Sequence, residues 1–261
     1  MSETALSKVR IVLVEPAGAL NVGSIARILK NMGLHRLVLV NPGCDPLCAE
    51  ARQMAVHAGD VLAAAEIVQT LPAALVGCQR AIATAVRTRS TQTPLEHPRN
   101  ALPWLLQGED GVESALIFGP EDRGLSNEEL KYAQRLVCIP SSPVYTSLNL
   151  AQAVAICSYE LYQYELYQIE AMGQQGTEAD SESEPMPQRV VGSSAPLEAI
   201  ESYFRQLEEL LLTVGFIYPH TAQSRMEKLR RLLNRAYPSV AEVTMLRGIL
   251  RQIDWALKLK R

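Results

Sequence analysis

The feature that most constrains the fold of this chain is a series of short apolar runs that alternate with longer segments of helical patterning. The runs cover residues 9–14, 37–40, 80–86, 115–118 and 136–139. Continuous apolar runs of this length are typical of strands buried on both faces, and their alternation with helices is typical of a parallel sheet. The pattern therefore predicts an α/β domain with an open, Rossmann-like parallel sheet over residues 1–170.

Helix signals lie between these runs. Asn21 is a candidate N-cap for a helix that ends before Gly33, and further helices are expected over residues 47–58 and 148–170. In open parallel sheets, ligands bind outside the carboxyl ends of the strands. We therefore expect the functional residues of this domain to lie directly after the strands.

Two capping-box spacings predict where further helices begin. Ser126 and Glu129 predict a short helix after the fourth apolar run. Ser224 and Glu227 predict a helix that begins near residue 225.

The formal net charge of −3 is an average over segments of opposite sign. Residues 197–261 carry 11 basic and 7 acidic side chains, whereas residues 1–196 carry 14 basic and 21 acidic ones. Residues 171–196 contain Gly, Ser, Pro and acidic residues but few apolar ones, which is typical of a solvated linker. The sequence thus predicts a domain over 1–170, an acidic linker over 171–196 and a basic extension over 197–261.

The extension is predicted to form helices over residues 197–212, 225–236 and 240–258. In the second helix, Met226, Leu229 and Leu233 share one face, and the opposite face holds Arg225, Lys228, Arg231 and Arg235. The third is expected to bury Val243, Leu246, Leu250, Ile253 and Leu257 and to expose Arg247, Arg251 and Lys258. Adjacent basic faces favour contact with phosphates, and an ordinary solvated surface is the alternative.

Several protein classes are disfavoured by what the sequence lacks. It has no Gly-x-Gly-x-x-Gly after the first run, no Walker loop and no His-Glu-x-x-His, which argues against a dinucleotide-binding fold, a P-loop NTPase and a zinc hydrolase. The four histidines are scattered and the five cysteines form no Cys-x-x-Cys pair, so we expect no metal site and reduced thiols. Without a signal peptide or a membrane-spanning run, the chain is expected to be cytoplasmic.

Three polar segments follow predicted strands and are more specific than ordinary loops. They are Asn21-Val-Gly-Ser-Ile-Ala-Arg27, Phe118-Gly-Pro-Glu-Asp-Arg-Gly-Leu125 and Ile139-Pro-Ser-Ser-Pro-Val-Tyr-Thr-Ser-Leu-Asn149. The first offers a helix N-terminus and an arginine, which both suit a phosphate. The second has two glycines that let the backbone approach a ligand, and Glu121 and Arg123 to hold its polar groups. In the third, Ser147 or Asn149 is expected to cap the helix that follows.

Together these segments resemble the three motifs of the SPOUT methyltransferases, over about residues 9–165. That resemblance implies an α/β SPOUT fold with a C-terminal trefoil knot, an exception to the rarity of knots. It also implies S-adenosylmethionine as cofactor, S-adenosylhomocysteine as product, and a homodimer whose sites are completed across subunits. The segments 228–236 and 246–250 resemble the small helical extension of the TrmJ branch, which methylates the ribose 2′-oxygen of nucleotide 32, a cytidine or uridine, in the tRNA anticodon loop.

The resemblance further implies which residues bind the cofactor, mainly through their backbone groups. They are Thr84, Ala85, Val86, Gly119, Glu121, Ile139, Thr146, Ser147 and Leu148. Relatives often have Thr-Ser-Ala-Arg where this chain has Thr-Ala-Val-Arg at residues 84–87, so one hydroxyl is absent at position 85.

The same resemblance assigns the central catalytic role to Arg27. A guanidinium stays protonated, so we expect Arg27 to hold a phosphate and stabilise the developing alkoxide rather than to act as a base. Ser147 and Asn149 are expected to orient the ribose hydroxyl. Candidate tRNA contacts are Asn21, Arg27, Arg87, Arg89, Arg123, Arg225, Lys228, Arg231 and Arg235.

Two other functions compete with this prediction. One is a 2′-O-methyltransferase that acts on another tRNA position or on ribosomal RNA, and the match of the extension to one branch argues against it. The other is a non-catalytic RNA-binding protein with the same fold. The presence of Arg27, Glu121, Ser147 and Asn149 argues against this alternative, and binding of S-adenosylmethionine would separate it from the enzymes.

Overall fold

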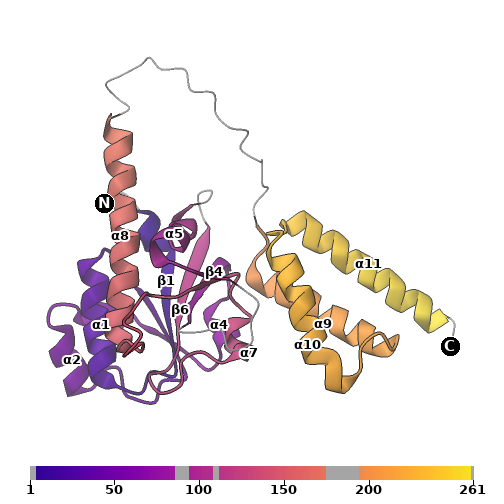
Figure 1. Cartoon of the computed structure of the whole chain (residues 1–261), viewed down its shortest axis with the longest axis horizontal. Helices are drawn as coiled ribbons and strands as arrows, with labels where there is room; N and C mark the ends of the chain where they lie inside the picture. Colours follow the sequence, from indigo (N-terminus) through magenta and orange to yellow (C-terminus); the bar gives the residue numbers. More distant parts are fainter. Residues whose placement is uncertain (1–3, 86–93, 108–111, 175–193, 260–261) are drawn as a thin grey trace. The chain divides into compact units, whose positions relative to one another are not determined.

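The computed structural model describes residues 4–85, 94–107, 112–174 and 194–259. The chain forms two compact units, of which unit 1 comprises Met1–Ala74 and Arg80–Gln188, and unit 2 comprises Leu75–Gln79 and Arg189–Arg261. Figure 1 shows a sheet flanked by helices in unit 1 and long helices in unit 2. None of the helices in the described residues is long and apolar enough to cross a membrane.

A seven-stranded sheet with the order β3-β2-β1-β6-β4-β7-β5 forms the centre of unit 1. The strands are β1 (Val9–Val14), β2 (Arg36–Val40), β3 (Glu66–Val68), β4 (Cys78–Thr84), β5 (Leu95–Glu96), β6 (Glu113–Phe118) and β7 (Arg135–Val137). The pairings of β1 with β2 and β6, of β2 with β3, and of β7 with β4 and β5 are parallel. The predicted open parallel sheet is therefore confirmed.

All five predicted apolar runs are strands, whereas β3 and β5 were not predicted. These two strands occupy the edges of the sheet and have only three and two residues. An edge strand needs less apolar surface, and Ile67 in β3 is 52% exposed. The apolar signal that identifies central strands is therefore weak at the edges.

Helices cover both faces of the sheet, with α1, α2 and α8 on one face and α4 and α7 on the other (Figure 1). The helices of unit 1 are the 3-10 helix η1 (Ala5–Lys8), α1 (Ala19–Asn31), α2 (Ala49–Ala55), α3 (Gly59–Ala63), α4 (Leu71–Ala74), α5 (Pro98–Ala101), α6 (Pro103–Leu106), α7 (Asn127–Leu130) and α8 (Leu150–Gln174). Helix α1 packs against α2 and α8. Its buried residues Val22, Ile25 and Leu29 join the main core.

Three helices of unit 1 have boundaries that differ from the prediction, and one of them is α8, which spans Leu150–Gln174 rather than residues 148–170. Helix α1 begins at Ala19 with Gly18 at the N-cap position, so Asn21 lies inside the first turn and is not the cap. The helix expected over residues 47–58 ends at Ala55, because Val56 adopts a left-handed φ of 54°. The capping box of Ser126 and Glu129 is confirmed at the start of α7.

Unit 2 contains α9 (Leu197–Thr213), α10 (Pro219–Asn234) and α11 (Val240–Leu259). A separate core forms around Phe204, Ile217, Met226 and Val243. The predicted apolar face of the second helix is confirmed, because Leu229 and Leu233 pack against this core as well.

Three expectations for unit 2 are wrong. Helix α10 begins at Pro219, where Pro has a fixed φ suited to a first turn, so Ser224 lies within the helix and caps nothing. Ile253 is 42% exposed, because the core of unit 2 ends before the last turns of α11. Arg247, expected to be exposed, is half-buried and donates from Nε to Oε1 of Gln206 at 3.3 Å.

Candidate active site

The three polar segments meet where the parallel strands β1, β6 and β7 end. The side-chain amide of Asn21 joins them, since its Nδ2 donates to Oε1 of Glu121 at 2.9 Å and its Oδ1 accepts from Nδ2 of Asn149 at 3.0 Å. Glu121 lies in the loop after β6, and Asn149 lies in the loop after β7. One residue of α1 therefore connects the loops that follow β6 and β7, two strands that β4 separates in the sheet.

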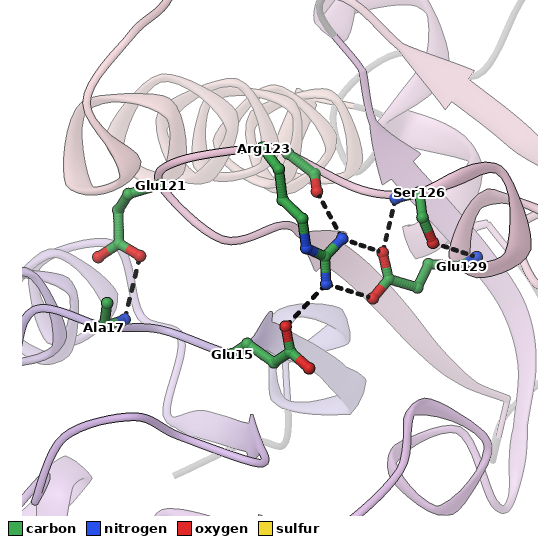
Figure 2. A network of polar contacts seen from close by, with 7 residues as sticks. Glu15, Ala17, Glu121, Arg123, Ser126 and Glu129 are labelled. Carbon is green, nitrogen blue, oxygen red and sulfur yellow. Dashed lines mark hydrogen bonds and ion pairs between the residues drawn. The ribbon is translucent and has the colours of Figure 1, made fainter.

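Glu121 caps α1 from outside the helix. Its carboxylate accepts from the backbone N–H groups of Ala17 at 3.1 Å and Gly18 at 3.2 Å, and Figure 2 shows the first of these contacts. Although partial burial acts to raise the pKa of Glu121, the hydrogen bonds from Asn21, Ala17 and Gly18 hold it below its ordinary value. A carboxylate at a helix N-terminus also interacts favourably with the helix dipole. The structure thus gives Glu121 a positioning role, and its contact with a cofactor stays a prediction.

Arg123 connects the loop after β6 to the end of β1 (Figure 2). Its Nη2 donates to Oε2 of Glu15 at 2.7 Å and to Oε1 of Glu129 at 3.0 Å, and its Nη1 donates to Oε2 of Glu129 at 2.9 Å. The hydrogen bonds from Glu129 and Glu15 raise the pKa of Arg123 above its ordinary value. Two carboxylates balance this guanidinium, so it is less available for a phosphate than an unpaired arginine. Its role as a tRNA contact stays a prediction.

Glu15 is a site residue that the sequence reasoning missed. It directly follows β1 and adopts a φ of 47°, a left-handed conformation that costs free energy for a residue other than Gly. Its backbone N–H donates to the carbonyl of Val40 at 2.8 Å, and its carboxylate binds Arg123. The expectation that functional residues directly follow strands applies to this position and would have identified it.

Two glycines of the motifs are required by close packing. A Cβ on Gly23 would lie 2.1 Å from the carbonyl oxygen of Ala51, where α1 crosses α2. A Cβ on Gly119 would lie 2.4 Å from the backbone nitrogen of Leu125 and 2.5 Å from the carbonyl carbon of Gly124. The loop after β6 therefore folds tightly back on itself, which fixes the position of Glu121 and Arg123.

Of the two candidate caps for α8, the structure uses Asn149. Its Oδ1 accepts from the backbone N–H groups of Ala151 at 2.9 Å and Gln152 at 3.4 Å. Both ends of this amide are therefore engaged within the protein. Ser147 is exposed, and its hydroxyl makes no hydrogen bond with any other described residue. Ser147 is thus better placed than Asn149 to contact a bound molecule.

Arg27 lies on the exposed side of α1, beyond Asn21. Within the described part of the chain, its guanidinium has no hydrogen-bond or ion-pair partner. This cation therefore remains available, in contrast to Arg123. Three other predicted site residues, Val86, Arg87 and Arg89, lie outside the described residues.

The residues expected to bind a cofactor lie along the carboxyl edge of the sheet. Thr84 and Ala85 are tied to it, since Oγ1 of Thr84 donates to the carbonyl of Ile117 at 3.2 Å and the N–H of Ala85 donates to that of Val137 at 2.8 Å. In contrast, the N–H groups of Gly119, Ile139 and Leu148 donate no hydrogen bond to another described residue, although all three residues are half-buried. A backbone N–H group without a partner in the protein can donate to water or to a bound molecule. These residues therefore fit a ligand that is held by backbone groups.

Among the described residues, no three or more His, Cys, Asp or Glu side chains form a cluster that could hold a metal ion. All five cysteines are free. Burial raises the pKa of the Cys157 thiol to about 12, so this side chain is an inert part of the core.

The chain thus combines a parallel sheet, polar segments joined at its carboxyl edge and a second, helical unit, which is the arrangement expected of a SPOUT methylase with an appended domain. The model of the SpoU rRNA Methylase family matches residues 8–159, and the model of the C-terminal domain of tRNA methyltransferase TrmJ matches residues 198–261. The chain belongs to the SpoU methylase family and carries a TrmJ-type C-terminal domain.

Relatives match along almost the whole chain. The tRNA (cytidine/uridine-2′-O-)-methyltransferases TrmJ of Pectobacterium atrosepticum and Salmonella typhimurium are both 39% identical over 249 residues, which cover 95% of this chain and 98% and 97% of those proteins. The crystal structure of TrmJ from Z. mobilis ZM4 has a TM-score of 0.77 at 28% identity and covers 94% of this chain and 98% of its own.

A probable methylase family protein from Haemophilus influenzae has a TM-score of 0.60 at 31% identity, and the match covers 98% of this chain and all of that one. These matches confirm the predicted SPOUT fold with a helical extension. The knotted path of the chain stays a prediction.

Proposed function

We propose that this enzyme methylates the ribose 2′-hydroxyl of nucleotide 32, a cytidine or uridine, in the anticodon loop of tRNA, with S-adenosylmethionine as methyl donor. The name shared by relatives that are 39% identical over 95% of the chain supports a tRNA 2′-O-methyltransferase. The observation that carries the proposal is a contrast within the site. Asn21 is hydrogen-bonded to both Glu121 and Asn149, whereas Arg27 has no partner among the described residues. Such an arrangement fixes the loops of the site and leaves one cation available for an anionic substrate.

The backbone around Gly119, Ile139 and Leu148 supports the choice of cofactor. The unused N–H groups of these residues can bind the adenine and ribose, and Thr146 and Ser147 flank the same loop. When bound, S-adenosylmethionine supplies a methyl group that is activated by the positive charge of its sulfur. Titration calorimetry with S-adenosylmethionine tests this part of the proposal. Saturable binding is expected, and the absence of any heat of binding would favour a non-catalytic RNA-binding protein.

The protein has two tasks in such a reaction, which are alignment and charge stabilisation. Arg27 binds the phosphate next to the reacting nucleotide and stabilises the negative charge that develops on its 2′-oxygen as the hydroxyl releases its proton to solvent water. The exposed hydroxyl of Ser147 orients the 2′-hydroxyl by a hydrogen bond. Asn149 acts indirectly, because its amide already caps α8 and holds Asn21.

We also propose a homodimer in which α8 contributes to the interface. Its exposed apolar side chains include Tyr159 at 47%, Tyr167 at 67% and Ile169 at 54% exposure. Exposed aromatic and aliphatic side chains on one helix are typical of protein interfaces. Sedimentation at several concentrations tests this, and a monomer at all of them would contradict it.

We further propose a separate role for each segment of the chain. The catalytic domain extends to the end of α8 at Gln174 rather than to residue 170, the acidic segment after it is a linker, and residues 197–261 bind tRNA through basic helices. Ala195, at the end of the segment predicted as linker, belongs to the core of unit 2. The extension has more basic than acidic side chains, and phosphate neutralisation is the main sequence-independent source of affinity for nucleic acids. We also propose that the enzyme acts in the cytoplasm, where a tRNA substrate is available.

A further inference from the structure

The loop between α9 and α10 exposes aromatic side chains, which phosphate binding by the basic helix faces does not require. Phe216 is 57% exposed and Tyr218 is 56% exposed, whereas Ile217 between them is only 1% exposed. The three residues thus alternate outward, inward and outward. Two exposed rings therefore flank one buried residue on the surface of unit 2.

This loop is held in place by contacts within unit 2. Gly215 adopts a left-handed φ of 73°, and the carbonyl of Leu211 accepts from the N–H groups of Phe216 at 3.0 Å and Ile217 at 3.3 Å. On the other side, the N–H of Tyr218 donates to Oγ1 of Thr221 at 3.2 Å. The exposed rings are therefore fixed by the loop rather than placed on a chain that must be ordered on binding.

Polar groups next to the two rings indicate which kind of ligand this surface can bind. The guanidinium of Arg225 lies 5.6 Å from the ring centroid of Phe216 and donates to the Phe216 carbonyl at 3.2 Å. The rings of Tyr218 and His220 are stacked, with centroids 5.9 Å apart and an angle of 13° between the planes. Lys228, one turn beyond Arg225 on α10, carries a further cation. The surface thus combines flat aromatic faces with cations.

We infer that Phe216, Tyr218, His220 and Arg225 form a stacking platform for unpaired RNA bases. Single-stranded nucleotides are held by stacking of bases on aromatic faces, with cations that follow the backbone, whereas paired bases offer no free face. A purely apolar protein partner would not require Arg225 and Lys228 beside the rings. The inference rests on the proposed RNA substrate and adds that unit 2 binds unpaired nucleotides as well as phosphates.

The experiment compares variants of the full chain in binding to two RNAs. One RNA is a hairpin with the anticodon stem and its open loop, and the other is the same stem closed by a tight, stacked tetraloop. The double variant Phe216→Leu/Tyr218→Leu removes both rings but keeps apolar side chains. We expect it to lose about tenfold or more in affinity for the open loop, with little change for the closed one. Phe216→Tyr retains a ring and is expected to bind like the unmodified chain.

Salt dependence separates stacking from charge. The double variant is expected to keep the slope of log affinity against log salt concentration, because it removes no cation. Val214→Ala in the same loop, where Val214 is 45% exposed, controls for a general effect of truncation. Equal affinity of the double variant and the unmodified chain for the open loop, or an equal loss for both RNAs, would overturn the inference.

The binding assay needs no S-adenosylmethionine, so its outcome does not depend on catalysis. A chain that binds the open loop through these rings but transfers no methyl group to tRNA would contradict the proposed function and leave the platform intact. If the double variant methylates nucleotide 32 and binds RNA as tightly as the unmodified chain, the platform is contradicted and the proposed function is not.

Discussion

The side-chain amide of Asn149 donates a hydrogen bond to Oδ1 of Asn21 at 3.0 Å, although the two residues are 128 positions apart in the chain. Asn149 also caps α8, and Asn21 also binds Glu121, which caps α1. The starts of both helices and the loop after β6 are therefore held by one chain of hydrogen bonds. Arg27 is on the same helix as Asn21, so a shift in the start of α1 would also displace Arg27.

We expect Asn21→Ala to lower both stability and activity. The substitution removes a donor to Glu121 and an acceptor for Asn149, which should reduce the free energy of unfolding by about 1–2 kcal/mol. Single-turnover methyl transfer should fall about tenfold or more, since a small displacement of a catalytic group has a large effect. Asn31→Ala, at the exposed end of α1, is the control and should change neither quantity. Wild-type turnover in Asn21→Ala would show that this hydrogen-bond chain does not position the site.

Arg27→Ala is expected to abolish methyl transfer and leave the affinity for S-adenosylmethionine near that of the unmodified chain. The reason is that the guanidinium has no partner among the described residues and contributes to neither the fold nor the cofactor loops. Methyl transfer to tRNA and titration calorimetry measure the two effects. Arg52→Ala, an exposed arginine on α2, is the matched control. Near-normal turnover in Arg27→Ala would remove Arg27 from the mechanism.

Gly23→Ala is expected to destabilise the protein by about 2 kcal/mol, because the added Cβ would lie 2.1 Å from a backbone oxygen of α2. Gly248→Ala in the middle of α11 is the control, since its Cβ would meet no atom within 4 Å. That substitution should stabilise the helix by about 0.5–1 kcal/mol. Urea unfolding measures both, and a similar effect at the two sites would contradict the close packing of α1 on α2.

The sequence predicted the central strands because they are buried on both faces and read as continuous apolar runs. It also predicted the capping box at Ser126, because the two partners, Ser126 and Glu129, are close together in the sequence. It placed the N-cap of α1 at Asn21, because local patterns cannot show that Glu121, 103 residues beyond Gly18 in the chain, provides the cap. Non-local contacts of this kind decide most of the site.

The same limit applies to the charged residues. Arg123 is as basic in the sequence as Arg27, but only the fold shows that Glu15 and Glu129 bind one of them and none of the described residues binds the other. Ile253 has the right helical spacing for the core and is nevertheless exposed, because the core of unit 2 does not extend to the end of α11.

Acidic pH is expected to lower the free energy of unfolding through the contacts of Glu129. Burial raises the pKa of Glu129, but its hydrogen bonds with Arg123 and Ser126 outweigh this and hold the pKa below the ordinary value. A carboxyl with a lowered pKa in the folded state contributes stability above its unfolded value of about 4.3, and this contribution is lost as the pH falls through the folded value. The free energy of unfolding should therefore drop below about pH 4.3.

Glu129→Gln removes this contribution and should flatten the acid side of the stability curve, whereas Glu66→Gln, on the exposed edge strand β3, should leave it unchanged. Urea unfolding between neutral and acid pH measures the difference. An identical curve for Glu129→Gln would show that the contacts of Glu129 with Arg123 and Ser126 contribute nothing to stability.

The basic face of α10 is expected to set the salt dependence of tRNA binding. Lys228, Arg231 and Arg235 have no ion-pair partner in the described part of the chain. Replacing all three by Ala should weaken binding and reduce the slope of log affinity against log salt by about 0.7–0.9 for each phosphate that the variant no longer neutralises. Lys258→Ala, which removes a cation already paired with Asp254 at 2.6 Å, is the control. An unchanged slope in the triple variant would mean that this face is an ordinary solvated surface.

The most direct test of the proposed function maps the methylated ribose. The full chain is incubated with S-adenosylmethionine and an unmodified tRNA transcript, and 2′-O-methylation is located nucleotide by nucleotide. The same tRNA with a 2′-deoxyribose at nucleotide 32 serves as the control. We predict a single new methyl group on the ribose of nucleotide 32, which is absent from the deoxy control and from the reaction of Arg27→Ala. Methylation at another nucleotide, or none on any tRNA, would contradict the proposal.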